Sequence, residues 1–318
     1  MVENECIARP KRRKTLLIAL GGNALIRKHQ RGTIPEQFAN LKIPVRQIAR
    51  LSQHYRVIIT HGNGPQVGNL LLQQECCDAV PKLPLEILVA QTQGQIGYMI
   101  ESTLDTALME MGIHFKQPFI TLISYVVVDE NDPAFAAPTK PIGPVLGGAP
   151  AAYAFPTRLT AKGLRRVVAS PRPITVVEQR EIKKLIDMGF IVICCGGGGI
   201  PVIREGRRFH GVDAVIDKDL VSARLARDIG VDTFVIATDV PGLAVDFGTD
   251  RERFLDTVTV GALEDLARAG HFPPGTVGPK VEALKAFVRG GGPQAVVCAL
   301  EDIEPAAAGR AGTRIVPA

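Results

Sequence analysis

Short apolar runs that end in glycine-rich turns recur along this chain, and they constrain its fold more than any other feature. Each run is too short for a stable helix and too continuously apolar for a strand with one wet face. It therefore predicts a strand buried on both sides, as in a parallel sheet. Three such units are Thr15–Leu20 followed by Gly21-Gly22-Asn23, Arg56–Thr60 followed by His61-Gly-Asn-Gly64, and Phe190–Cys195 followed by Gly196–Gly199.

Segments with apolar residues at helical spacing separate these strand-like runs. The first, residues 34–53, places Phe38, Leu41 and Val45 on one face, and we expect Pro44 to kink or split it. Alternating strands and helices predict an α/β fold, with a mostly parallel sheet and helices on both faces. The other expected helices are 66–77, 85–111, 176–188, 217–229, 260–269 and 279–288, and the other expected strands are 119–128, 232–237 and 295–299.

Residues 129–171 differ from the rest of the chain in composition. They are rich in proline, with several glycines and alanines, which predicts an inserted flap or small subdomain. A disordered linker is the alternative, but Tyr153, Phe155 and the pair Val167-Val168 give the segment apolar surface to pack. Its prolines are Pro133, Pro138, Pro141, Pro144, Pro150, Pro156 and Pro171.

The formal charge of +5 and the six cysteines bear on partners and compartment. A basic run, residues 11–14, lies in a predicted tail, residues 1–14. No aromatic residues interleave with basic ones to stack bases, so we expect no nucleic acid partner, and an anionic substrate fits the charge equally well. Adjacent cysteine pairs without a CxxC favour reduced thiols and a cytoplasmic location. No apolar run reaches about 18 residues, so we expect no membrane span.

The glycine turns are candidate phosphate-binding loops. In open α/β sheets, ligands bind at the carboxyl ends of strands, where glycine lets backbone N–H groups approach an anion. Asn23 and Asn63 can each add a side-chain donor. The sequence has no GxxxxGK[ST] motif, so it has no P-loop. It also has no GxGxxG after the first strand, which argues against nicotinamide binding. The pattern therefore favours phosphoryl transfer, for which charge neutralisation and positioning matter most.

Three lysines lie in unusual settings for such chemistry. Lys140 is inside the predicted flap, and Lys218 and Lys280 are at predicted helix starts. A positive charge at a helix N-terminus opposes the helix dipole. Nearby anions, from a ligand or from Asp217 and Asp219, would compensate.

His61 and the pair Cys194-Cys195 invite catalytic roles that the sequence does not favour. His61 precedes the glycine of its loop, and we interpret it as a loop or packing residue. Cys194 and Cys195 have no histidine beside them and fall in a predicted buried strand, so we interpret both as core residues.

The chain resembles the carbamate kinases, within the amino acid kinase superfamily, over nearly all of residues 15–318. The resemblance implies a three-layer αβα sandwich with a small protruding flap, a homodimer, and one domain, 15–318. In that domain, 15–205 would bind the acceptor and 206–318 the nucleotide. The matching motifs, in chain order, are IALGGNAL at 18–25, THGNGPQVG at 60–68, QGQIGYMI at 93–100, PTKPIGP at 138–144, RRVVASPRPI at 165–174, CGGGGIPVI at 195–203, GVDAVIDKDL at 211–220 and GPKVEA at 278–283.

The resemblance also implies a reaction, ATP + carbamate ⇌ ADP + carbamoyl phosphate with Mg²⁺, in catabolic ATP generation such as arginine metabolism. Lys218 and Lys280 would neutralise the transferred phosphoryl group, Asp217 would orient both lysines, and Lys140 would reach in from the flap. Leu20 stands where the wider superfamily often has a lysine, and the flap lysine would substitute. No residue is assigned as a metal ligand. The acceptor site would comprise Gly21, Gly22, Asn23, Gly62 and Asn63, and the nucleotide site Ala237, Thr238, Asp239, Val240, Gly275, Thr276, Val277 and Lys280.

The chain departs from the family pattern at the flap and on the adenine side. Leu164 replaces a usual tryptophan, the flap between Gly143 and Arg165 is shortened, Gly275-Thr276-Val277 replaces Gly-Ser-Met, and 239–243 lacks a tyrosine. Two alternatives therefore stay open. One is a kinase of the same fold acting on another small carboxylate or phosphonate, and the other is a catalytically silent ligand-binding homologue.

Overall fold

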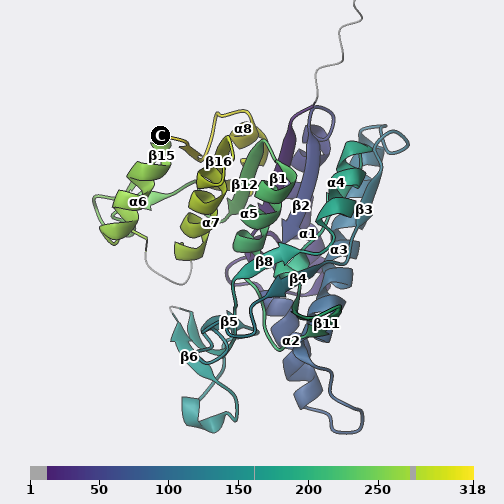
Figure 1. Cartoon of the computed structure of the whole chain (residues 1–318), viewed down its shortest axis with the longest axis vertical. Helices are drawn as coiled ribbons and strands as arrows, with labels where there is room; N and C mark the ends of the chain where they lie inside the picture. Colours follow the sequence, from purple (N-terminus) through teal and green to yellow (C-terminus); the bar gives the residue numbers. More distant parts are fainter. Residues whose placement is uncertain (1–12, 161, 273–276) are drawn as a thin grey trace, which may run out of the picture.

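A central sheet of eight strands organises the molecule (Figure 1). The computed structural model describes residues 13–160, 162–272 and 277–318. The strand order is β15-β17-β16-β12-β1-β2-β9-β3, and every neighbouring pair is parallel except β16 with β17. The strands are β15 (Thr257–Thr259), β17 (Thr313–Val316), β16 (Gln294–Ala299), β12 (Thr233–Thr238), β1 (Thr15–Leu20), β2 (Arg56–His61), β9 (Ile191–Ile193) and β3 (Phe119–Thr121).

Helices cover both faces of this sheet, which confirms the predicted αβα sandwich. Alternate residues of β1 divide between two cores: Leu16 and Ile18 pack towards α1, α3 and α8, and Leu17 packs towards α4, α5 and α7. Burying one leucine or isoleucine side chain completely stabilises the folded state by about 1.5–3 kcal/mol relative to leaving it exposed. The helices are α1 (Ile34–Leu51), α2 (Gly64–Glu75), α3 (Leu85–Glu110), α4 (Gln179–Asp187), α5 (Lys218–Ile229), α6 (Val260–Arg268), α7 (Gly278–Arg289) and α8 (Ile303–Ala307).

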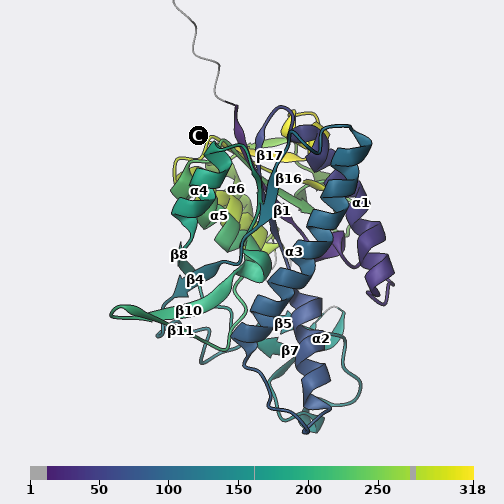
Figure 2. The same cartoon turned by 90° about the vertical axis from the view of Figure 1, so that its right-hand side faces the viewer.

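A smaller sheet lies beyond the carboxyl ends of the central strands (Figure 2). Its order is β11-β10-β4-β8, and β10 and β11 form a projecting hairpin. Two further small sheets and three short 3₁₀ turns complete the described structure. The remaining elements are β4 (Tyr125–Val128), β5 (Lys140–Ile142), β6 (Thr157–Thr160), β7 (Gly163–Val168), β8 (Pro173–Val176), β10 (Ile200–Glu205), β11 (Arg208–Gly211), β13 (Ala244–Val245), β14 (Arg253–Phe254), η1 (Gly22–Ala24), η2 (Pro150–Ala152) and η3 (Gly196–Gly198).

Two expectations about elements are wrong, and of the two outcomes expected for Pro44, a kink or a split, the structure excludes the split. The single strand expected at 119–128 is two strands, β3 and β4, which belong to different sheets. The helix expected at 176–188 begins only at Gln179, because Val176 ends strand β8. Pro44 does not split α1, which runs unbroken with Leu41 and Val45 buried on either side of it.

The segment expected to form a flap contains an antiparallel sheet, β5-β7-β6, rather than a disordered linker. It rests on α2, since the N–H of Gly143 donates to the carbonyl of Gly64 at 3.0 Å. The contact is so close that a Cβ on Gly68 would lie 2.0 Å from the nitrogen of Gly143. We use the term flap for residues 140–168 of this segment.

No helix in the described parts of the chain combines the length and apolar character needed to cross a bilayer.

Candidate active site

The first two glycine turns lie side by side at the carboxyl edge of the sheet. Leu20 is in register with His61 on one side and with Ala237 on the other. The N–H of Gly21 donates to the carbonyl of Ala237 at 2.9 Å, and the N–H of Gly62 donates to the carbonyl of Leu20 at 3.3 Å. A Cβ on Gly22 would meet nothing within 4 Å, so this turn borders open space.

The third glycine turn, 196–199, does not border open space. All four glycines are buried, and Gly197 has a φ of +66° that a side chain would strain. A Cβ there would lie 2.2 Å from Nδ2 of Asn63, and one on Gly196 would lie 2.4 Å from Nε2 of His61. This turn therefore supports the second loop from beneath and presents no surface to a phosphate.

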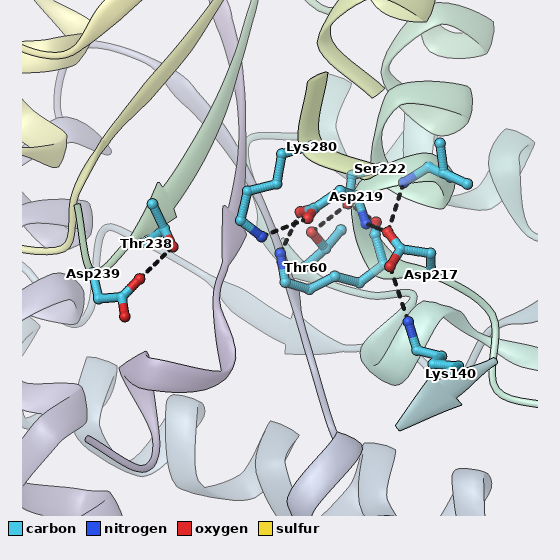
Figure 3. Close-up of polar contacts among 10 residues, drawn as sticks. Thr60, Lys140, Asp217, Asp219, Ser222, Thr238, Asp239 and Lys280 are labelled. Atoms are coloured by element: carbon cyan, nitrogen blue, oxygen red, sulfur yellow. Dashed lines mark hydrogen bonds and ion pairs between the residues drawn. The ribbon is translucent and has the colours of Figure 1, made fainter. Parts of the chain in front are cut away.

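Asp219 joins two of the three lysines singled out in the sequence (Figure 3). Lys218 donates from its Nζ to Oδ1 of Asp219, and Lys280 donates from its Nζ to Oδ2 at 3.0 Å. The Asp219 side chain is only 3% exposed. Because α5 and α7 pack together, the lysines at their first turns meet at one carboxylate.

Asp217 holds the third lysine instead of the first two. Its Oδ1 accepts the N–H of Asp219 at 2.9 Å and so caps α5, and its Oδ2 accepts Nζ of Lys140 at 2.9 Å. We expected Asp217 to orient Lys218 and Lys280, but their direct contacts belong to Asp219. Asp217 links α5 to the flap.

The pKa shifts in this cluster follow from burial opposed by ion pairing. Burial alone would raise the pKa of Asp217, but Lys140 and then Lys218 and Lys280 outweigh burial and lower it. Burial lowers the pKa of Lys218 despite Asp219, whereas Asp219 and Asp217 overcome burial and raise the pKa of Lys280. Three lysines face two aspartates in this cluster, so it favours a bound anion.

A buried hydroxyl pair fixes the start of α5. Oγ of Ser222 donates to the carbonyl of Lys218 at 2.6 Å and lies 2.7 Å from Oγ1 of Thr60, at the end of β2. The stem of Lys218 crosses the second glycine loop, since a Cβ on Gly62 would lie 3.4 Å from its Cδ. The sequence analysis gave no role to Thr60, although it begins the motif at 60–68, and none to Ser222, because a small hydroxyl residue does not by itself indicate a contact of this kind.

His61 and Asn63 serve the packing of the second loop. His61 is 2% exposed, and burial lowers its pKa to about 4. Its Nδ1 lies 3.1 Å from the carbonyl of Gly62. Asn63 is 2% exposed and donates from Nδ2 to Oγ1 of Thr92 at 2.9 Å, so one of its two donors is already used.

Four of the expected nucleotide-binding residues, 237–240, lie at the end of β12 or directly after it. Ala237 and Thr238 are buried, Asp239 is exposed, and Oγ1 of Thr238 donates to Oδ1 of Asp239 at 3.1 Å. Val240 follows them, and Val277 occupies the N-cap position of α7, two residues before Pro279, without a side-chain cap. The expected residues Gly275 and Thr276 lie outside the described residues.

Carboxylates suitable for a metal are few here. In the part of the chain that the structure describes, no three or more His, Cys, Asp or Glu residues group together as metal ligands. Asp217 and Asp219 already pair with lysines. The site suits a cation that arrives bound to phosphates better than one caged by protein.

Comparison with known proteins gives consistent matches over almost the whole chain. The model of the amino acid kinase family matches residues 14–299. The carbamate kinase of Pyrococcus furiosus is 43% identical over 314 residues, which cover 96% of this chain and 99% of that protein.

Solved structures agree with the sequence matches. Carbamate kinase from Giardia lamblia bound to citric acid superposes with a TM-score of 0.90 at 37% identity, covering 96% of this chain and 99% of that one. The structure from Giardia lamblia bound to AMP-PNP gives a TM-score of 0.88 at the same identity and coverage.

Proposed function

The chain belongs to the amino acid kinase family and has the function of a carbamate kinase, and we propose that its five-residue cluster carries out the phosphoryl transfer. The cluster is Lys140, Asp217, Lys218, Asp219 and Lys280. One observation carries this assignment: lysines from three separate segments converge on two aspartates beside the open turn at Gly22.

The reaction needs charge neutralisation more than it needs a base. Carbamate is already an anion, so its oxygen attacks the γ-phosphorus of ATP directly, the bond to the bridging β–γ oxygen breaks, and ADP leaves. Lys218 and Lys280 contact the equatorial oxygens of the moving group, Asp219 keeps them apart, and Lys140 approaches from the flap. Backbone N–H groups at Gly22, Asn23 and Asn63 bind the acceptor side. Gly21 and Gly62, whose N–H groups hold the two turns against Ala237 and Leu20, let the backbone pass close to the acceptor.

The nucleotide occupies the other side of the cluster, near 237–240 and 275–280. Mg²⁺ would accompany the nucleotide's phosphates, as suits an ion that uses one or two carboxylates and keeps several waters. Asp239, which is exposed and held by a single hydroxyl contact, is the carboxylate best placed to assist. The ion supplies charge neutralisation at the phosphates.

ATP formation from carbamoyl phosphate and ADP tests the function. We expect turnover with carbamoyl phosphate and far less with acetyl phosphate, which carries a different acyl group on the same phosphate. Preference for another acyl phosphate would favour a different small-carboxylate acceptor. Binding of ADP without any ATP formation would favour a catalytically silent homologue.

We extend the proposal to assembly and location. Apolar side chains on α1 and α3 are exposed, with Ile43 at 42%, Tyr98 at 65% and Met109 at 56%, which supports a homodimer through these helices. Light scattering would measure its mass. The free, exposed Cys76 and Cys77 are consistent with the reducing cytoplasm. The division into 15–205 for the acceptor and 206–318 for the nucleotide, and catabolic ATP generation such as arginine metabolism, belong to the same proposal.

A further inference from the structure

Cys76 and Cys77 form an adjacent pair of thiols on the surface, directly after the last residue of α2. Both are free and exposed. The other adjacent pair, Cys194 and Cys195, is buried, with 1% exposure for each residue. A reagent in solution can therefore reach two neighbouring sulfurs only at the end of α2, within the described residues.

The last turn of α2 fixes these cysteines relative to Glu75. The N–H of Cys76 donates to the carbonyl of Gln73 at 3.2 Å, and the N–H of Cys77 donates to that of Gln74 at 3.3 Å. Sγ of Cys76 also contacts the carbonyl oxygen of Leu72 at 3.3 Å. Glu75 lies inside this turn and precedes Cys76 directly, so a group that bridges the two sulfurs binds beside it.

Glu75 connects the turn to the flap. Its Oε1 accepts Nη1 of Arg166 on β7, and that guanidinium carbon lies 4.1 Å from the ring centre of Phe155. Arg166 is in register with Ile142 of β5, the strand that begins at Lys140. A continuous path of contacts therefore runs from Cys76 and Cys77 to the flap lysine.

We propose that Cys76 and Cys77 are a dithiol site for trivalent organic arsenicals, R–As=O, and that occupying it loosens the flap. Two S–H bonds break and two As–S bonds form, and the arsenic oxygen leaves with both protons as water. The oxidation state of arsenic does not change, so no oxidant is needed. The effect of the bound arsenical on turnover rests on the proposed function, whereas its capture by the two thiols does not.

The geometry favours this ligand over the two other dithiol chemistries. A direct disulfide would join Cα atoms about 3.8 Å apart, below the usual range of about 4.4–6.8 Å. Zn²⁺ prefers about four ligands. The described residues contain no grouping of three or more metal-ligating side chains, so the two thiols have no further protein ligands to complete a zinc site. An arsenic atom that carries one organic group needs only two sulfurs and inserts between them.

Phenylarsine oxide is the probe, with intact-protein mass, hydrogen exchange and turnover as readouts. We expect one phenylarsenic group per chain, removed by 2,3-dimercaptopropanol but retained in excess 2-mercaptoethanol. Hydrogen exchange should quicken in 140–168, and kcat should fall about two- to fivefold, because a partly exposed ion pair contributes modestly.

Two variants separate capture from coupling. The Cys76→Ser/Cys77→Ser variant keeps Cys194 and Cys195, so it should bind no arsenical and keep its turnover. Glu75→Gln should still bind the arsenical but lose the response of the flap. Equal labelling of the double-serine variant would overturn the site, and labelling of the wild type without faster exchange in 140–168 would overturn the coupling. Because mass and exchange need no catalysis, an untreated protein without turnover would count against the proposed function alone.

Discussion

Asp219 holds two ammonium groups with one carboxylate, and almost none of its side chain meets solvent. Burial would raise its pKa, but Lys218 and Lys280 outweigh burial and lower it. The carboxylate of Asp219 is therefore ionised at neutral pH. Removing its charge would leave two lysines facing each other in a buried site.

We predict that Asp219→Asn lowers the free energy of unfolding by about 3–5 kcal/mol, because breaking a buried ion pair strands the remaining charges. Urea denaturation at pH 7 measures the change. The matched control is Asp265→Asn, whose exposed pair with Arg268 on α6 should cost about 1 kcal/mol at most. Equal stability of Asp219→Asn and the wild type would refute this description of the cluster.

His61 makes stability depend on pH in a defined window. Its folded pKa is about 4, against 6.5 in an ordinary setting, because burial disfavours the imidazolium form. The unfolded chain therefore takes up a proton below about pH 6.5 and the folded chain does not. The His61 contribution is fully present above that pH and is lost as pH falls towards 4, by about 3 kcal/mol in total.

We predict that His61→Asn, whose amide can reach the same carbonyl of Gly62, loses this pH dependence between pH 6.5 and 4. Urea denaturation at several pH values measures it. A slope unchanged by the substitution would show that other groups titrate in this window.

At the scale of residues, the sequence predicted which charged side chains form the cluster better than it predicted which of them pair with one another. Lys218 and Lys280 are at helix starts, as expected from the positions of the helices. Which aspartate serves them was not predictable from spacing. Asp217 is the N-cap of α5, so its carboxylate turns towards its own helix and the flap, which leaves Asp219 to face Lys280.

At the scale of elements, α2 and the flap form one contact unit. Gly68 and Gly143 approach so closely that a Cβ on Gly68 would clash with the backbone of Gly143, and Glu75 pairs with Arg166 at the far end of α2. The strand that begins at Lys140 is therefore positioned by α2 as well as by its own sheet.

We predict that Gly68→Ala lowers kcat at least tenfold with little change in the melting temperature, because the added methyl group displaces the flap rather than the core. The ATP-forming assay and thermal unfolding measure the two effects. Gly261→Ala, in a helix with nothing within 4 Å of the added Cβ, is the control and should keep full kcat. A wild-type kcat in Gly68→Ala would show that the flap need not rest on α2.

Element prediction was most accurate where glycine directly follows a strand. Glycine follows β1 and β2 closely, and both strands were predicted to within a residue. The strand expected at 190–195 is shorter than predicted, because two residues separate the end of β9 (Ile191–Ile193) from Gly196. Between β3 and β4 the chain turns at 122–124 without glycine or proline, so two strands read as one apolar run. Strand β8 was hidden because its last residue, Val176, also fits the helical spacing of the segment that follows.

At the scale of the molecule, one sheet unites the parts assigned to acceptor and nucleotide. Strand β1 pairs with β2 on one side and with β12 on the other, so the glycine turns and the 237–240 segment share an edge. The small sheet β11-β10-β4-β8 lies beyond that edge (Figure 2). This order of strands depends on long-range packing, and the sequence predicted the layers but not the order.

The central claim is that the converging lysines, held by the two aspartates, stabilise the phosphoryl group in transit. The kcat of Lys218→Ala for ATP formation from carbamoyl phosphate and ADP tests it most directly, with Lys42→Ala, an exposed lysine on α1, as the control. A preorganised charge of this kind is worth about 3 kcal/mol, so we predict a loss of about 10²–10³-fold with the fold unchanged. A loss below about tenfold would contradict the claim.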